Sequence, residues 1–284
     1  MTARTLGQRI TRRRTNAPRT STRQSRMRDA ITFAVFLILL ILLWEWAVGF
    51  FHVRKIVIPA PSAILNALYI GLTASGRQSF FPHIWATLKE VVAGYVVGCS
   101  FGLLLAMLTV RFRTFEVLFR PLAVGLQSVP KVALAPLMLI WFGLGFQSKF
   151  ALVTLATFFP LFINGMAGFN SVELGHVRMM RSFQATGSQI FRKVQFKTAL
   201  PFIFAGLEIS VVHAVTAAVA AELLAGQEGL GVRIIQSEQT FDLPSIFAVL
   251  LLLGVMGGCL YGIVAFVRKR VVTWTGDRLL YADQ

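Results

Sequence analysis

Acidic residues are scarce in this sequence. Only 12 Asp and Glu stand against 28 Lys and Arg, giving a formal net charge of +16, and charged residues make up just 14% of the chain. With so few carboxylates and only four histidines, no catalytic pair of acids, no Ser/His/Asp set and no His/Cys metal spacing can be proposed. We therefore expect neither an enzyme nor a metal site.

Cysteine and nucleotide-binding signatures are also lacking. The two cysteines, Cys99 and Cys259, each stand beside a glycine inside an apolar run, which is typical of small packing residues and not of a disulfide or metal pair. The glycines and lysine of Trp141–Lys149 do not form G-x-x-x-x-G-K-[ST], and no strand precedes them. We expect this chain to bind no cofactor, so that any energy-supplying domain must belong to another chain.

Long apolar runs dominate what is present. Hydrophobic residues make up 56% of the chain, and several runs approach the roughly 20 residues that a helix needs to cross a bilayer. The pattern predicts an all-α polytopic membrane protein of about six transmembrane helices. The expected spans are residues 31–51, 84–110, 121–144, 150–169, 201–225 and 243–267.

Positive charge supports a topology with both termini in the cytoplasm. Most Lys and Arg fall in segments that this layout places inside the cell. Residues 1–29 are rich in arginine but hold no aromatic residue that could stack on bases, which argues against nucleic acid. They are expected to be a disordered cytoplasmic tail that sets topology and touches anionic membrane lipid, followed by a transmembrane domain over residues 30–284.

One sizeable polar segment, residues 170–200, separates two of these spans. Glu173 is its single acid among several Lys and Arg, which indicates a cytoplasmic location. Its apolar residues form two triplets at i, i+1, i+4, which predict two short amphipathic helices with a break at Gly187. The apolar sides of such helices must be covered, either by lipid headgroups or by a soluble partner. The candidate contact residues are Arg178, Met179, Met180, Phe183, Gln184, Ala185, Gly187, Ile190, Phe191 and Val194.

Prolines interrupt the third expected span. Pro130 and Pro136 each remove an amide donor and strain the preceding turn, so this helix should be kinked or broken. Broken helices at membrane depth usually line protein interior or a water-filled path. Two interpretations stay open: Gln127, Ser128, Pro130 and Pro136 belong to a pore or gate, or the segment is simple kinked packing.

Two spans carry glycines at four-residue spacing, so that one face of each helix lacks side chains and allows close helix approach. These ladders are either generic packing or a seam for a dimer or the pore. They comprise Gly94, Gly98 and Gly102, and Gly254, Gly258 and Gly262.

Ionisable residues inside spans are candidates for function. Glu90 follows Lys89 and is expected to be structural or interfacial. Glu208 and His213 lie about 140° apart around a helix, which weakens a proton relay. Glu222, near the external end of the fifth span, forms either a gate or a structural hydrogen bond. A stand-alone ion-coupled secondary transporter or channel that uses such residues is the alternative function.

Five linked stretches within residues 59–274 carry a family resemblance: IPAPSAI, TLKEVVAGYVVG, SVPKVALAPLMLIWFGLGFQSK, FFPLFINGMAG and AELLAGQEGLG. Together they resemble the permease subunits of binding-protein-dependent type I ABC importers, within the nitrate, sulfonate and taurine group. The resemblance implies a multi-pass permease of the bacterial cytoplasmic (inner) membrane. It also implies a partner ATPase dimer, an extracytoplasmic solute-binding protein and a second permease, either a copy or a different chain.

The polar segment corresponds to the EAA loop of that family, whose short helix docks on the ATPase. Here the usual glutamate is replaced by Arg178, the two alanines by Met179 and Met180, and the glycine by Gln184. We expect Gly187 to take over the bend. Because Arg178 reverses a charge, either a heterodimer or an ATPase with a compensating acid is implied. The solute implied by the family is a small oxyanion, a sulfonate such as taurine, or a thiamine-precursor-like molecule.

Overall fold

The computed structural model describes residues 22–52, 57–76, 79–127 and 129–274. The chain divides into two units, residues 1–53 and 54–284. The first unit contains α1 (Thr22–Phe50), of which Met27–Phe50 is long and apolar enough to cross a membrane. Because α1 begins at Thr22, residues 22–29 of the expected disordered tail are helical; residues 1–21 lie outside the described part.

The second unit is helical throughout its described secondary structure. Its α-helices are α2 (Pro61–Thr73), α3 (Phe81–Arg111), α4 (Arg113–Gln127), α5 (Ala135–Phe142), α6 (Phe146–Asn170), α7 (Leu174–Ser182), α8 (Gly187–Ile190), α9 (Phe196–Ala225), α10 (Leu230–Gln239) and α11 (Leu243–Val271). A short 3-10 turn, η2 (Lys131–Leu134), precedes α5, and a π-helical turn, η3 (Phe191–Gln195), joins α8 to α9.

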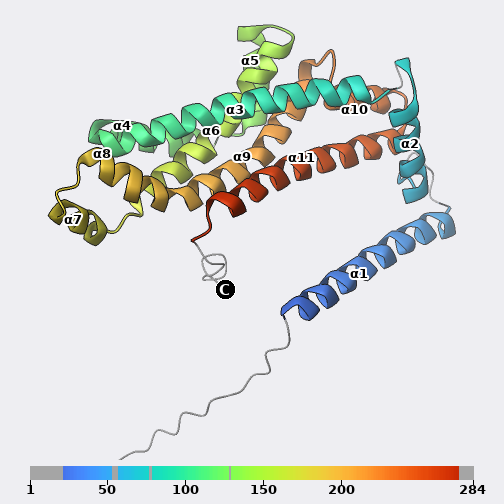
Figure 1. Ribbon diagram of the computed structural model, residues 1–284. Helices are drawn as coiled ribbons and strands as arrows, with labels where there is room; N and C mark the ends of the chain where they lie inside the picture. The colour runs from blue at the N-terminus through green and yellow to red at the C-terminus, as the bar shows by residue number, and fades with distance from the viewer. Residues whose placement is uncertain (1–21, 53–56, 77–78, 128, 275–284) are drawn as a thin grey trace, which may run out of the picture. The chain divides into compact units, whose positions relative to one another are not determined.

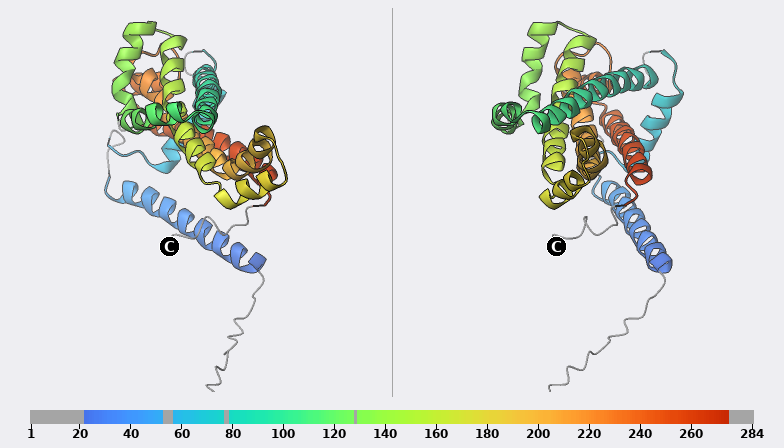
Figure 2. Two further views of the ribbon diagram at one scale, coloured as in Figure 1. Left: turned by 90° about the vertical axis from the view of Figure 1, so that its left-hand side faces the viewer. Right: turned by 60° about the vertical axis from the view of Figure 1, so that its left-hand side comes forward.

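Helix α6 forms the centre of this unit, packed between α3 and α9, with α11 against α9. Its buried side chains include Leu152, Phe162 and Met166. Phe162 and Met166 join Ala106 of α3 and Ala199 of α9 in one apolar core. Figure 1 shows α4, α7 and α8 at one end of the unit and α2 and α10 at the other. The left view of Figure 2 turns the α7–α8 end toward the viewer.

Five described helices are long and apolar enough to span a membrane, against the expected six. The third expected span, residues 121–144, is not one helix. It comprises the second half of α4, a break around Pro130, η2, and α5 with Pro136 in its first turn. The prolines therefore interrupt the helix as predicted, because neither can donate the amide that a continuous helix requires.

Three helices lie wholly or partly in the connections between the expected spans. Helix α2 follows Pro59, α4 begins directly after Phe112, and α10 fills most of the connection between the last two spans. Helix α10 is too short and too polar to be a span, yet Leu230 and Val232 are buried. Short helices of this kind are stabilised by packing and not by their own propensity.

The first glycine ladder forms a seam inside the chain. A Cβ on Gly94 would lie 2.6 Å from Cβ of Val153, and one on Gly102 would lie 2.6 Å from the carbonyl oxygen of Phe158. At Gly98 a Cβ would overlap Thr157 and the backbone of α6. Close approach of α3 and α6 therefore requires these glycines, which is the generic packing interpretation.

Candidate functional site

The segment expected to contact a partner consists of α7, a tight reversal at residues 183–186, and α8, which continues through η3 into α9. Helix α7 ends in a Schellman motif: the Gln184 N–H donates to the Arg181 carbonyl (2.9 Å) and the Ala185 N–H to the Met180 carbonyl (3.1 Å). Gln184 has a positive φ of 56°. The bend therefore lies at Gln184, where the EAA-loop resemblance implies a glycine, and the expectation that Gly187 provides it is wrong.

Gly187 instead occupies the first turn of α8. Thr186 caps that helix, accepting from the Gln189 N–H (3.4 Å), while the Gln189 side chain accepts from the Thr186 N–H (2.8 Å). This reciprocal capping box fixes where the second helix begins. The two expected helices are present, but the second is the start of a continuous helical run, Gly187–Leu224.

The two apolar triplets have different surroundings. In the first, Met179 and Phe183 are exposed and Met180 is partly buried. In the second, Ile190 is buried and Phe191 stacks on Phe169 with ring centroids 5.8 Å apart. Phe191 and its neighbour Val194 are themselves partly buried, so only the first triplet presents a largely exposed apolar surface to a partner.

Basic side chains surround that surface. Arg178 and Arg181 on α7 are exposed, as are Arg192 and Lys193 on η3. The lone acid, Glu173, lies 3.8 Å from the ring of His176. The exposed surface of this segment therefore combines positive charge with the apolar side chains of Met179 and Phe183.

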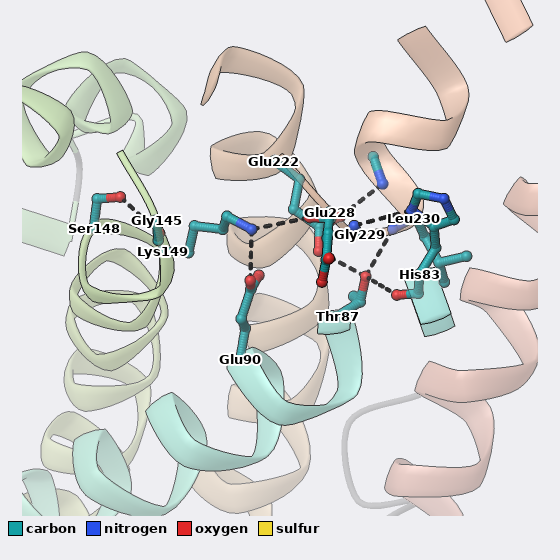
Figure 3. Close-up of polar contacts among 11 residues, drawn as sticks. His83, Thr87, Glu90, Gly145, Ser148, Lys149, Glu222, Glu228, Gly229 and Leu230 are labelled. Carbon is teal, nitrogen blue, oxygen red and sulfur yellow. Dashed lines mark hydrogen bonds and ion pairs between the residues drawn. The ribbon is translucent and has the colours of Figure 1, made fainter. Parts of the chain in front are cut away.

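At the other end of the unit, Glu222 of α9 anchors a buried polar network (Figure 3). Its Oε1 accepts from Thr87 Oγ1 of α3 (2.6 Å) and its Oε2 from the Gly231 N–H of α10 (2.6 Å). Thr87 Oγ1 also accepts from the Leu230 N–H (2.8 Å), and the Gly229 N–H donates to His83 Nδ1 (3.2 Å). A Cβ on Gly229 would overlap the Glu222 carboxylate, so Glu222 ties α3, α9 and the start of α10 together.

A buried ion pair extends this network to α6. Lys149 Nζ lies 2.6 Å from Glu90 Oε1, and it also donates to the carbonyl of Glu228 (3.0 Å). Both side chains are 5% exposed. Glu90 is therefore structural, as expected, but its partner is Lys149, 59 residues further along the chain, and not the adjacent Lys89.

The other intramembrane candidates do not converge. Glu208 lies 3.1 Å from Arg268 Nη1 of α11 and 3.4 Å from the hydroxyl of Tyr261. His213, about one and a half turns further along α9, belongs to neither polar group. Gln127 ends α4 and Ser128 lies outside the described residues, so the pore role of both stays a prediction.

An apolar groove of about 690 Å³ runs along α9 and α11. Gly254 and Gly258 contribute to its wall, and a Cβ on Gly254, Gly258 or Gly262 would meet nothing within 4 Å. Val132 of η2 also lines the groove, so the segment broken by Pro130 borders it. The second glycine ladder thus faces open space, whereas α6 packs against the first.

Thr87 and Lys149 were not singled out from the sequence. A lysine at the start of an apolar span can indicate a buried ion pair, because a buried ammonium needs an acidic partner. Thr87 gave no signal, since a single threonine in a span usually bonds to its own helix.

A sequence profile described as "binding-protein-dependent transport system inner membrane component" matches residues 98–273. The chain belongs to this family. It is therefore an ABC importer permease of the inner membrane, and the matched region includes the α7–α8 segment and the groove helices.

Named relatives span nearly the whole permease. A formylaminopyrimidine transport permease of Halalkalibacterium halodurans is 32% identical, covering 81% of this chain and 91% of its own. A riboflavin transport system permease of Chloroflexus aurantiacus is 29% identical, and the match covers 91% of this chain and 95% of the relative. A taurine transport system permease of Escherichia coli is 28% identical, with coverage of 87% of this chain and 91% of the relative. The crystal structure of an amino acid ABC transporter with histidines shares the fold, with a TM-score of 0.56, 17% identity, and coverage of 67% of this chain and 93% of that one.

Proposed function

We propose that this permease carries a small solute, delivered by an extracytoplasmic binding protein, across the cytoplasmic membrane in an importer powered by a separate ATPase dimer. The observation that carries the proposal is the exposed apolar surface of α7, where Phe183 is 74% and Met179 51% exposed. Apolar side chains held outward among charges are typical of a docking surface. ATP and Mg²⁺ are assigned to the partner.

The solute path is proposed to run along the groove between α9 and α11. A second permease, either a copy of this chain or a different one, would complete the path and contact the ladder of Gly254, Gly258 and Gly262. The two permeases would rock between outward-open and inward-open states as the ATPase dimer closes and opens below. The α7–α8 segment transmits that motion, because α8 continues directly into the groove helix α9.

The solute is proposed to be either a sulfonate, taurine or nitrate-like oxyanion or a thiamine-precursor-like molecule. The taurine and formylaminopyrimidine relatives support these two classes. The groove wall is mostly Val, Leu, Ala and Gly, with Thr216 as its polar member among the described residues. Such a wall does little to distinguish solutes, so selection is assigned to the binding protein.

The test is uptake by proteoliposomes that contain the permease, its ATPase and its binding protein. Radiolabelled taurine and formylaminopyrimidine should be compared, with ATP supplied on the ATPase side. We expect uptake to require all three components and ATP, and to persist with a protonophore. Uptake by the permease alone, abolished by the protonophore, would instead support the stand-alone ion-coupled transporter.

A point variant tests the docking surface directly. Phe183→Asp should lower the amount of ATPase that co-purifies with the permease while leaving the yield of folded protein unchanged. Phe241→Asp is the matched control, since Phe241 is also exposed but lies between α10 and α11. Equal retention of the ATPase by both variants would count against α7 as the contact.

A further inference from the structure

Helix α7 is exposed around more than one side. Arg178 and Arg181 flank Leu174 on the helical wheel, about 60° apart at 100° per residue, and all three are exposed. The side that faces the rest of the unit is marked by partly buried Val177 and Met180. Leu174, at 71% exposure, thus lies on the same side of α7 as these two arginines, about one turn before Arg178 and two turns before Arg181.

The second exposed side of α7 is apolar. Phe183 lies about 140° around the helix from Arg178, and Met179 lies between these two directions. A flat surface such as a bilayer can contact only one of these sides at a time. A concave protein surface can contact both, with α7 seated in it as a ridge. Figure 1 shows α7 at the extremity of the unit, beyond the end of α9, where such a surface can approach.

The guanidinium groups of α7 lack acidic partners within the described part of the chain. Neither Arg178 nor Arg181 forms an ion pair there. The acids near this end lie close to other residues, Glu116 to Arg120 and Glu173 to the ring of His176. Arg192 and Lys193 add two further exposed cations on η3. A partner with basic or neutral residues in its groove would leave this charge unpaired or repelled.

We propose that α7 docks in an acidic groove of the ATPase subunit, in which carboxylates pair with Arg178 and Arg181 while an apolar recess receives Met179 and Phe183. Arginine and carboxylate groups form paired, charge-assisted hydrogen bonds that fix orientation as well as affinity. The inference rests on the proposed function and adds the chemistry of the partner surface. It also selects an ATPase with compensating acids as the way this chain accommodates Arg178.

The test uses the ATPase that co-purifies with the permease from native membranes, identified by peptide mass spectrometry through its nucleotide-binding motifs and then purified alone. Its affinity for the permease in lipid nanodiscs is measured at low and at physiological ionic strength. Arg178→Glu/Arg181→Glu should weaken binding roughly tenfold or more and flatten its salt dependence. Lys269→Glu/Arg270→Glu is the matched control, reversing two exposed cations at the end of α11, and should bind as the native permease does.

A charge swap completes the test. Glu→Lys or Asp→Lys substitutions in the ATPase groove should weaken binding to the native permease and restore binding to the Arg178→Glu/Arg181→Glu variant. If that variant binds the ATPase normally while Phe183→Asp does not, the acidic groove is wrong and the docking function stands. If neither variant changes binding, the docking function fails too. If the double variant changes ATPase binding only in nanodiscs that contain phosphatidylglycerol, and not in nanodiscs of neutral lipid, Arg178 and Arg181 contact lipid and the inference is overturned.

Discussion

Thr87 of α3 and Glu222 of α9 are joined by a buried hydrogen bond of 2.6 Å, although 135 residues separate them in the chain. Thr87 Oγ1 also accepts the Leu230 N–H, and Glu222 also accepts the Gly231 N–H. The two side chains therefore hold the start of α10 against α3 and α9. Their geometry favours the structural interpretation of Glu222 at this end of the permease, with a gating role left as a prediction.

Thr87→Val tests this junction. Valine keeps the shape but leaves the Leu230 N–H and one Glu222 oxygen without their partner, so we expect a loss of about 1–3 kcal/mol of stability. Thermal unfolding of the purified permease in detergent measures it. Thr216→Val is the control, because exposed Thr216 bonds only to carbonyls of its own helix among the described residues. Equal melting temperatures for both variants would mean that the junction contributes nothing.

Lys149→Met should be more damaging. It removes the partner of a Glu90 carboxylate that is buried between α3 and α6, and an uncompensated buried charge costs about 3–5 kcal/mol. Adding Glu90→Gln should recover much of the loss, because the remaining amide is neutral. A double-mutant cycle on chemical unfolding measures the interaction.

Lys89→Met supplies the control for that cycle. Lys89 is adjacent to Glu90 in sequence but is exposed, with its ammonium over the ring of Trp85. We expect little change in unfolding for this variant. If Lys89→Met and Lys149→Met lowered the free energy of unfolding by similar amounts, the ion pair between Lys149 and Glu90 would not be what stabilises the contact between α3 and α6.

The sequence predicted best what depends on local pattern. Long apolar runs located five of the six expected spans, Pro130 located the break in the other, and the four-residue spacing of Gly94, Gly98 and Gly102 predicted close helix approach. It could not say which helix would approach, because partner choice depends on tertiary packing. Thus the two glycine ladders have the same spacing but different surroundings: α6 packs against the ladder on α3, and no described residue packs against the ladder on α11.

The polar sites were harder to predict for the same reason. Glu222 was noticeable because an acid in an apolar run is costly, whereas Thr87, its partner, looks like any helical threonine. Lys149 and its partner Glu90 are 59 residues apart in the chain, so no local pattern links them. The bend in the α7–α8 segment was assigned to Gly187 because glycine adopts positive φ readily. The cap of α7 instead imposes that conformation on Gln184.

Alanine substitutions distinguish the two glycine ladders. At Gly98 a methyl group would overlap Thr157 and the backbone of α6, so Gly98→Ala should destabilise the permease by about 1–3 kcal/mol. Gly258→Ala should leave the stability of the isolated permease unchanged or slightly raised, because nothing lies within 4 Å. Thermal unfolding in detergent checks both expectations. Equal destabilisation by the two variants would contradict the open face of α11.

Because the bend in the α7–α8 segment lies at Gln184 and not at Gly187, we expect both residues to tolerate a substitution that would be harmful if the bend were at Gly187. Gln184 has a left-handed conformation that costs a side-chain-bearing residue about 1–2 kcal/mol. Gln184→Gly should therefore stabilise the permease by about 0.5–1 kcal/mol, after allowing for the greater freedom of glycine in the unfolded chain. Gly187 is in the first turn of α8 with open space around it, so Gly187→Ala should be neutral or stabilising.

Gln184→Val separates conformation from side-chain loss, because a β-branched residue tolerates positive φ poorly. We expect the highest melting temperature for the Gln184→Gly variant, an intermediate one for the native permease and the lowest for the Gln184→Val variant. If Gly187→Ala were instead strongly destabilising and Gln184→Gly had no effect, the bend would lie at Gly187. A hinge at Gly187 would then let α7 move independently of α9. With the bend at Gln184 and a capped α8, we expect displacement of α7 by a partner to be transmitted to the helix that lines the groove.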